Sequence, residues 1–121
     1  MKKLMTNEFK KWAKKEKIPH EKLAAAIDEV NNGVVEANLG GYLYKKRIAL
    51  HGKGKSKGAR TIICCKVNDR AIFLHGFSKS EKSNLSTKEQ KLYKEAAKAI
   101  MSMSIAKLNA AISKGVFIEV E

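Results

Sequence analysis

The sequence predicts a single α+β domain over residues 1–121, with N-terminal helices packed on a twisted antiparallel sheet and further helices at the C-terminal end. Apolar residues recur with helical period near both ends of the chain and with the two-residue period of strands in the middle. Segregated helices and strands, rather than a regular alternation of the two, are typical of the α+β class. A chain of 121 residues is long enough for one hydrophobic core and too short for two domains.

Two helices are predicted in the N-terminal third. The first has apolar residues at helical spacing among lysines: Met5, Phe9, Trp12 and Ala13. Ile18-Pro19 interrupts it, because the residue before a proline avoids the helical region and proline favours a helix start. The second helix is expected from about Pro19 to Asn31, where Asn32-Gly33 ends it.

The middle of the chain predicts an antiparallel meander of three strands. Residues 42–50 alternate, with Tyr44, Ile48 and Leu50 on one side of the strand and Lys45 and Arg47 on the other. Residues 61–67 and 71–77 form the next two strands, joined by a tight turn at 68–69. A loop rich in glycine and lysine, residues 51–58, links the first strand to the second, and an additional edge strand is expected at 34–37.

Two helices and a short strand are predicted after the meander. Residues 86–89 (Ser-Thr-Lys-Glu) form a capping-box pattern that opens a helix with Leu92, Ala96 and Ile100 in register. Residues 102–104 predict a break, after which a second apolar stripe continues to Lys114. Gly115 ends that helix, and residues 116–121 alternate like a final strand.

The cysteines and histidines indicate neither a disulfide nor a metal site. Cys64 and Cys65 are adjacent, so on a strand they point to opposite faces. We expect one buried apolar residue and one half-exposed thiol. His20, His51 and His75 do not have the spacing of metal ligands, and no cofactor is expected.

The charge composition indicates a polyanionic partner. Lys and Arg number 25 against 12 Asp and Glu, a formal net charge of +13. Such a balance favours nucleic acid, an anionic membrane or an acidic protein. No apolar run approaches the roughly 20 residues that span a bilayer, and the N-terminus lacks the apolar stretch of a signal peptide. We therefore expect a soluble, cytoplasmic chain with no membrane partner.

The positive charge is concentrated in the meander. No acidic residue lies between Glu36 and Asp69, and this stretch carries Lys45, Lys46, Arg47, Lys53, Lys55, Lys57, Arg60 and Lys66. Strand alternation places Lys45, Arg47 and Arg60 on one face of the sheet, and Lys79 and Lys82 follow the third strand. A surface normally mixes both signs of charge, so this segment predicts a polyanion-binding site.

Three motifs in the meander resemble one toxin family. The sequences Lys45-Lys46-Arg47-Ile48, GKGKSKGARTI (52–62) and the strand and cap from Phe73 to Ser86 occur in this order. Together they resemble the phage- and plasmid-associated branch of the RelE/HigB/ParE toxin superfamily. The resemblance implies a RelE-like fold, an acidic cognate antitoxin, and metal-independent cleavage of messenger RNA on the ribosome. It also implies basic site residues at Arg47, Lys53, Lys55, Arg60 and Lys79.

The predicted mechanism uses the 2′-hydroxyl of the RNA as its nucleophile. The protein then has to orient the phosphate, neutralise it and move protons. We assign the phosphate to Arg60, supported by Arg47, because guanidinium binds two oxygens and stays charged. Lys55 and Lys79 are the candidates for proton transfer, since neighbouring positive charges favour a neutral lysine.

Other residues are predicted to bind RNA or the ribosome: Lys45, Lys53, Lys57, Lys82, His51 and Phe77. His51 is also a candidate acid or base. For Phe77, a place in the core is favoured over stacking on a base. The general acid and base stay open, because Tyr93 lies within a predicted helix and neither His51 nor His75 matches the family's histidine positions.

The sequence leaves two rival functions open. A ParE-like protein on the same scaffold poisons DNA gyrase and has no nuclease chemistry, and fold alone does not separate it from an mRNA endonuclease. A non-catalytic RNA-binding protein would use the same basic residues for phosphates only. Arg60→Ala is predicted to abolish growth inhibition and to leave the fold intact.

Overall fold

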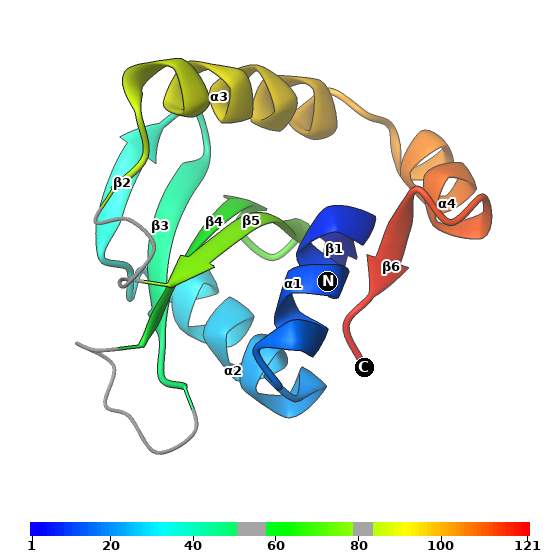
Figure 1. Ribbon diagram of the computed structural model, residues 1–121. Coiled ribbons are helices and arrows are strands. Elements are labelled where there is room, and N and C mark those ends of the chain that lie inside the picture. Colours follow the sequence, from blue (N-terminus) through cyan, green and yellow to red (C-terminus); the bar gives the residue numbers. More distant parts are fainter. Residues whose placement is uncertain (51–57, 79–83) are drawn as a thin grey trace.

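The computed structural model describes residues 1–50, 58–78 and 84–121, in which a six-stranded sheet lies between two pairs of helices (Figure 1). The strand order is β2-β3-β4-β5-β1-β6. The strands are β1 (Lys2–Thr6), β2 (Ala37–Gly40), β3 (Leu43–Ile48), β4 (Ala59–Lys66), β5 (Arg70–Ser78) and β6 (Phe117–Glu119). The helices are α1 (Asn7–Lys15), α2 (His20–Asn31), α3 (Thr87–Met101) and α4 (Ile105–Ser113). In this described part of the chain, no helix has the length and apolar character needed to cross a membrane.

The two faces of the sheet form two separate hydrophobic cores. Neighbouring residues of a strand point to opposite faces, so Ile63 packs with α1 and α2, and Ile62 packs with α3 and α4. Cys64 and Cys65 divide in the same way, as predicted. Both thiols are buried, however, so the expectation that one is half-exposed was wrong. The reason is that helices cover both faces of β4.

The predicted α+β class and the meander are confirmed. Strands β3, β4 and β5 pair antiparallel in sequence order, and the turn at 68–69 joins the last two. Asn68 has a left-handed φ of 60°, which asparagine tolerates better than most residues. The alternation in β3 is also confirmed, because Tyr44 and Ile48 pack in one core and Lys45 and Arg47 lie on the opposite face.

The strand β1 was not predicted. Met5 was assigned to the apolar stripe of the first helix, but it lies in β1, which runs parallel to β5 and antiparallel to β6. These partners are distant in the sequence, so a local pattern of five residues could not reveal them. The predicted edge strand also moves: β2 covers 37–40 rather than 34–37.

Helix ends follow the predicted capping chemistry. The Ser86 hydroxyl accepts from the backbone N–H of Glu89, and the Glu89 carboxylate accepts from the N–H of Ser86, so the capping box is present. At the end of α2, Gly33 has a φ of +83° and lets the chain reverse toward β2. The segment just before α3 lies beside β3, because Lys45 Nζ donates a hydrogen bond to Asn84 Oδ1 at 3.2 Å.

Candidate functional site

Three cations predicted from the sequence meet on one face of the sheet; we call Lys45, Arg47 and Arg60 the basic cluster. Arg47 on β3 lies directly opposite Arg60 on β4 in the strand register. Lys45 precedes Arg47 by two residues and therefore lies on the same face. This is the face that α3 covers farther along the sheet. Like charges directly opposite each other across a strand pair repel, so this arrangement needs a compensating group.

Glu36 supplies the compensating charge. Its backbone N–H donates to the carbonyl of Lys45 over 2.8 Å, which places it beside β3 just before β2. One carboxylate oxygen, Oε1, lies 3.0 Å from Arg60 Nε and 3.5 Å from Lys45 Nζ. The other, Oε2, accepts a hydrogen bond from Arg47 Nε. A single carboxylate thus contacts every member of the basic cluster.

The carboxylate of Glu36 stays ionised in this setting. Burial raises its pKa, but the hydrogen bond from Arg47 and the charges of Lys45 and Arg60 outweigh burial, so the pKa lies below its ordinary value. The Glu36 side chain is only 12% exposed. Its partners are therefore held by a charged interaction that solvent screens only partly.

The members of the basic cluster differ in their access to solvent. The Arg47 side chain is 46% exposed, whereas that of Arg60 is 8% exposed. Lys45 is also largely covered, and its Nζ donates to Asn84 Oδ1 at 3.2 Å, close to the start of α3. Arg47 is therefore the most accessible member of the basic cluster, and Arg60 lies on its buried side.

Phe77, His75 and Tyr93 lie next to the basic cluster. Phe77 is directly opposite Arg60 on β5 and is buried in the core under α3, as the favoured interpretation expected. The His75 ring stacks on Tyr93 at a centroid distance of 5.2 Å, and its Nδ1 lies 3.3 Å from Glu8 Oε1. His75 Nε2 is buried and has no hydrogen-bond partner among the residues that the structure describes.

Tyr93 is neutral at physiological pH. Burial, followed by the nearby carboxylates of Glu8 and Glu89, raises its pKa to about 12. Its ring covers the half-buried His75. Tyr93 lies within α3, as the sequence predicted.

Several predicted site residues lie outside the described residues: His51, Lys53, Lys55, Lys57, Lys79 and Lys82. The described strands show where both segments join the sheet. Ile48 at the end of β3 pairs with Ala59 at the start of β4, and Ala59 pairs with Ser78 at the end of β5. Residues 51–57 and 79–83 therefore both connect to the sheet at the end that carries Arg47 and Arg60.

Not every lysine of the acid-free stretch belongs to the site. Lys46 points to the opposite face, where its Nζ contacts Glu29 at 3.0 Å and donates to the carbonyl of Val34. Lys66 lies at the far end of β4 and is 4.0 Å from Asp69. The described cations of the acid-free stretch therefore lie in three places, and among the described residues only Lys45, Arg47 and Arg60 lie together.

Glu36 is the residue that the sequence analysis missed. The available signal was its position, because it is the last acidic residue before the acid-free stretch. The sequence analysis named Glu36 only as the start of the acid-free stretch. Only the pairing of β2 with β3 shows that the carboxylate turns back toward Lys45.

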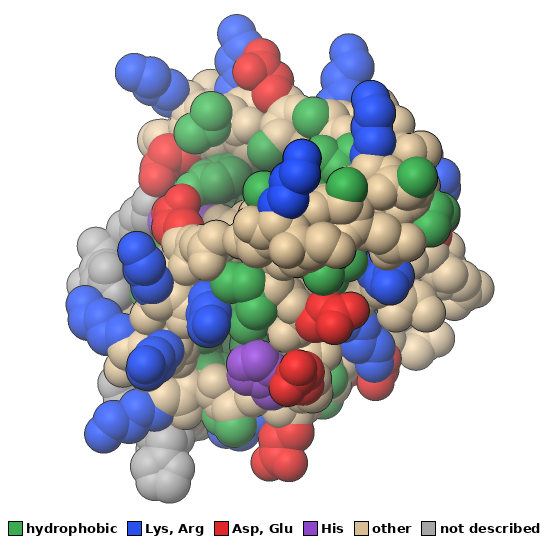
Figure 2. Space-filling view, turned by 90° about the vertical axis from the view of Figure 1, so that its right-hand side faces the viewer, with side chains coloured by type: hydrophobic (Ala, Val, Ile, Leu, Met, Phe, Trp, Pro, Cys, Tyr) green, Lys and Arg blue, Asp and Glu red, His purple; other side chains and the backbone are tan. Residues whose placement is uncertain are grey.

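The geometry favours the binding of an anion. Among the residues that the structure describes, the three cations of the basic cluster contact the carboxylate of Glu36, so these four charges sum to an excess of positive charge. Figure 2 shows a different face of the molecule, over which Lys and Arg side chains are also spread, and the chain as a whole has a formal net charge of +13. Such a field attracts a polyanion over a distance and concentrates it at the surface.

The comparisons with known proteins bear on the family of the chain. No curated protein matches the chain. The family described as the RelE toxin of the RelE/RelB toxin–antitoxin system matches residues 1–120. This match covers all six strands and all four helices described above. The chain therefore belongs to the RelE toxin family and is a toxin of a toxin–antitoxin system.

Proposed function

We propose that this toxin is a metal-independent, ribosome-dependent mRNA endonuclease that inhibits translation. The observation that carries the proposal is the register of β3 and β4, which sets Arg47 opposite Arg60 with Lys45 on the same face. Two guanidinium groups and an ammonium group at one sheet end suit a phosphodiester that acquires negative charge in the transition state. Family membership supports the toxin role.

In the proposed reaction the RNA supplies the nucleophile. The 2′-hydroxyl attacks the adjacent phosphorus in line with the 5′-oxygen, which leaves as the P–O5′ bond breaks. Arg47 receives the phosphate at the surface, and Arg60 stabilises the charge of the pentacovalent state from the inner side. Lys55 and Lys79 are proposed to exchange the protons, with His51 as the alternative acid or base. Lys53, Lys57 and Lys82 are proposed to bind the RNA backbone or the ribosome.

Glu36 has a different role in this proposal. Its low pKa makes it a weak base, so it is not assigned a proton transfer. In the RNA-free protein it offsets part of the positive charge of the basic cluster and holds the two guanidinium groups in place. The phosphate then competes with this carboxylate for Arg47 and Arg60. RNA binding is accordingly weaker than an unopposed basic cluster would give.

Cleavage of a messenger on purified, programmed ribosomes tests the proposal. Free RNA and an EDTA-treated reaction test the dependence on ribosomes and on metal. Arg47→Ala is the informative variant, because its half-exposed side chain can be removed with little effect on packing. We expect cleavage to fall by about 10²–10³-fold, the usual effect of removing one transition-state donor. Lys11→Ala, an exposed residue of α1, removes the same charge elsewhere and should leave cleavage unchanged.

Because Arg60 is largely buried, a loss of activity in Arg60→Ala could come from a loss of stability. Because Arg60 is buried against Glu36, Arg60→Ala leaves the carboxylate short of a partner and is expected to lower stability as well as activity. Arg60→Lys keeps the charge and serves as the matched variant.

Intact messenger together with growth inhibition and broken chromosomes would favour a gyrase poison. Salt-sensitive RNA binding without cleavage or toxicity would favour a non-catalytic binding protein.

A further inference from the structure

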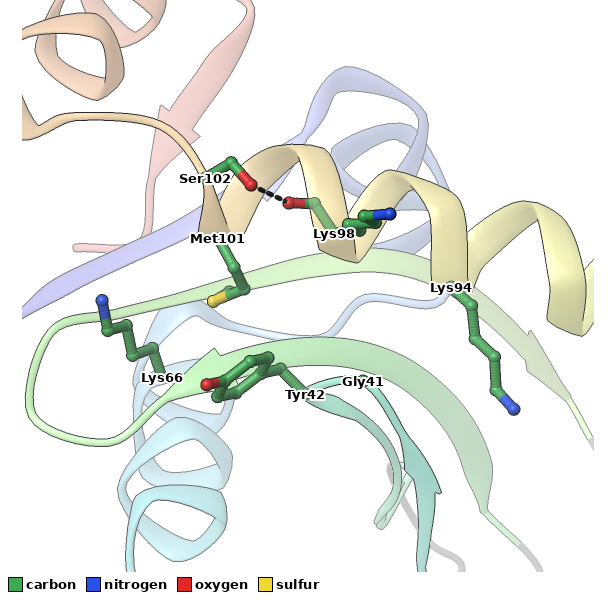
Figure 3. A pocket seen from close by; sticks show the side chains of 7 residues that line it. All are labelled: Gly41, Tyr42, Lys66, Lys94, Lys98, Met101 and Ser102. Carbon is green, nitrogen blue, oxygen red and sulfur yellow. Dashed lines mark hydrogen bonds between the residues drawn. The ribbon is translucent and has the colours of Figure 1, made fainter.

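A groove of about 390 Å³ lies at the opposite end of the strands from the basic cluster. It opens between the turn that joins β2 to β3, the end of β4 and the C-terminal half of α3. Figure 3 shows the side chains of Tyr42 and Met101 in this groove, with Lys66 on one side and the lysines of α3 on the other. Along β3, Tyr42 is five residues, or about 16 Å, from Arg47 and three residues, or about 10 Å, from Lys45.

The floor of the groove is apolar and its rim is positively charged. Tyr42 and Met101 contribute apolar surface, and Lys66, Lys94 and Lys98 carry the charge. Lys94 and Lys98 are four residues apart on α3 and so lie on the same helix face, one turn apart. Neither forms an ion pair with any residue that the structure describes, whereas Lys66 is 4.0 Å from Asp69.

The backbone around Tyr42 has an unusual conformation. Gly40, Gly41 and Tyr42 have consecutive left-handed φ angles of 87°, 61° and 66°. A bulky aromatic residue rarely adopts this conformation, and such residues often mark functional positions. The Tyr42 carbonyl accepts a hydrogen bond from the N–H of Cys65 at 2.9 Å, which holds the turn against β4. Despite this anchored backbone, Tyr42 is 51% exposed.

We propose that this groove is a docking site for an acidic segment of a partner protein, with one apolar side chain of that segment seated against Tyr42 and Met101. Charge complementarity selects an acidic segment, because the rim carries three lysines and the chain a net charge of +13. Carboxylates one helical turn apart on the partner match Lys94 and Lys98.

A protein segment fits the groove better than a nucleic acid does. Most of its surface is apolar, and no arginine lines it, so the fork that grips phosphate oxygens is missing from its described lining. The arginines Arg47 and Arg60 lie at the other end of the strands. The inference rests on the membership of a toxin–antitoxin family, which implies a protein partner, and does not depend on the nuclease proposal.

Binding of a labelled peptide to the full chain tests the inference. The probe is a fluorescent, glutamate-rich peptide with a single central leucine, and its controls replace every glutamate with glutamine or the leucine with serine. Lys94→Glu combined with Lys98→Glu reverses the charge of the rim on α3. The matched control is Lys88→Glu with Lys91→Glu, which makes the same change in net charge at exposed positions of the same helix outside the groove.

We expect the rim variant to weaken peptide binding about tenfold and the matched control to bind like the wild type. Tyr42→Asn should also weaken binding, since asparagine tolerates the left-handed backbone but lacks the ring. Both control peptides should bind more weakly than the probe. Equal loss in the two charge-reversed variants would overturn the inference, because it would indicate general attraction to a basic protein.

Binding of a labelled single-stranded RNA to the same variants tests whether the groove binds nucleic acid instead of a protein segment. If the rim variant loses RNA binding and keeps peptide binding, the groove is a nucleic-acid site and the inference is wrong. No binding of the probe by the wild type would also overturn it. Peptide binding is measured without ribosomes, so either result is independent of messenger cleavage. Cleavage by the rim variant on programmed ribosomes should equal that of the wild type.

Discussion

Replacing Glu36 with glutamine is expected to destabilise the protein by about 2–3 kcal/mol at neutral pH. The change keeps the shape of the side chain and removes the negative charge that contacts all three members of the basic cluster. At 3.0 Å, one pair of opposite charges attracts by about 5.5 kcal/mol for an effective dielectric constant of 20. Desolvation of the ions offsets much of this attraction, so we expect only about 2–3 kcal/mol of it to remain as stability. The exposed side of Arg47 adds little, because solvent screens it.

The pH dependence of stability separates this charge effect from a packing effect. The folded-state pKa of Glu36 is lower than that of the unfolded chain, which is about 4.3. Its contribution to the free energy of unfolding is therefore fully present above the unfolded pKa and is lost as the pH falls through the folded pKa. The gap in stability between the wild type and Glu36→Gln should be widest at neutral pH and should narrow in acid.

Urea unfolding followed by circular dichroism, at neutral pH and at several acidic values, measures this gap. We expect the free energy of unfolding to fall by about 2–3 kcal/mol at neutral pH, and thermal unfolding at the same pH should show a melting temperature lower by roughly 10 °C. Glu95→Gln is the matched control, because Glu95 is exposed on α3 and forms no ion pair with the residues that the structure describes. Equal stability of Glu36→Gln and the wild type at neutral pH would refute the reasoning. A gap that does not narrow in acid would assign the loss to packing instead.

The other predictions concern RNA affinity, packing and thiol reactivity. Glu36→Gln should bind single-stranded RNA several-fold more tightly, with a salt slope steeper by about one in fluorescence anisotropy titrations; weaker binding would mean that the carboxylate is needed for the geometry of the cluster. Gly76→Ala should destabilise the protein by about 1–3 kcal/mol in urea unfolding, since a Cβ there would overlap the indole ring of Trp12; unchanged stability would show that the ring moves aside freely. The buried Cys64 thiol, whose pKa is raised to about 12, should resist alkylation near neutral pH until the chain unfolds; rapid modification of the native protein, located by mass spectrometry, would contradict its burial.

Local chemistry made several elements predictable. The capping box at Ser86, the alternation around Lys45 and the turn at Asn68 each depend on residues within a few positions of one another. The same holds for the basic cluster. Strands β3 and β4 are consecutive and antiparallel, so the end of one lies beside the start of the next, and the alternation of apolar residues sets which side chains share a face. The sequence by itself therefore determined the α+β class, the meander and the convergence of Arg47 with Arg60.

Contacts between distant segments decided the rest. The parallel pairing of β1 with β5 joins residues nearly seventy positions apart, and no local pattern encodes it. Burial of both cysteines required helices on each face of β4. The position of Glu36 among three cations required β2 to fold back on β3. Sequence periodicity shows which side of a strand a residue occupies, but only tertiary packing brings a particular carboxylate within reach of Arg60.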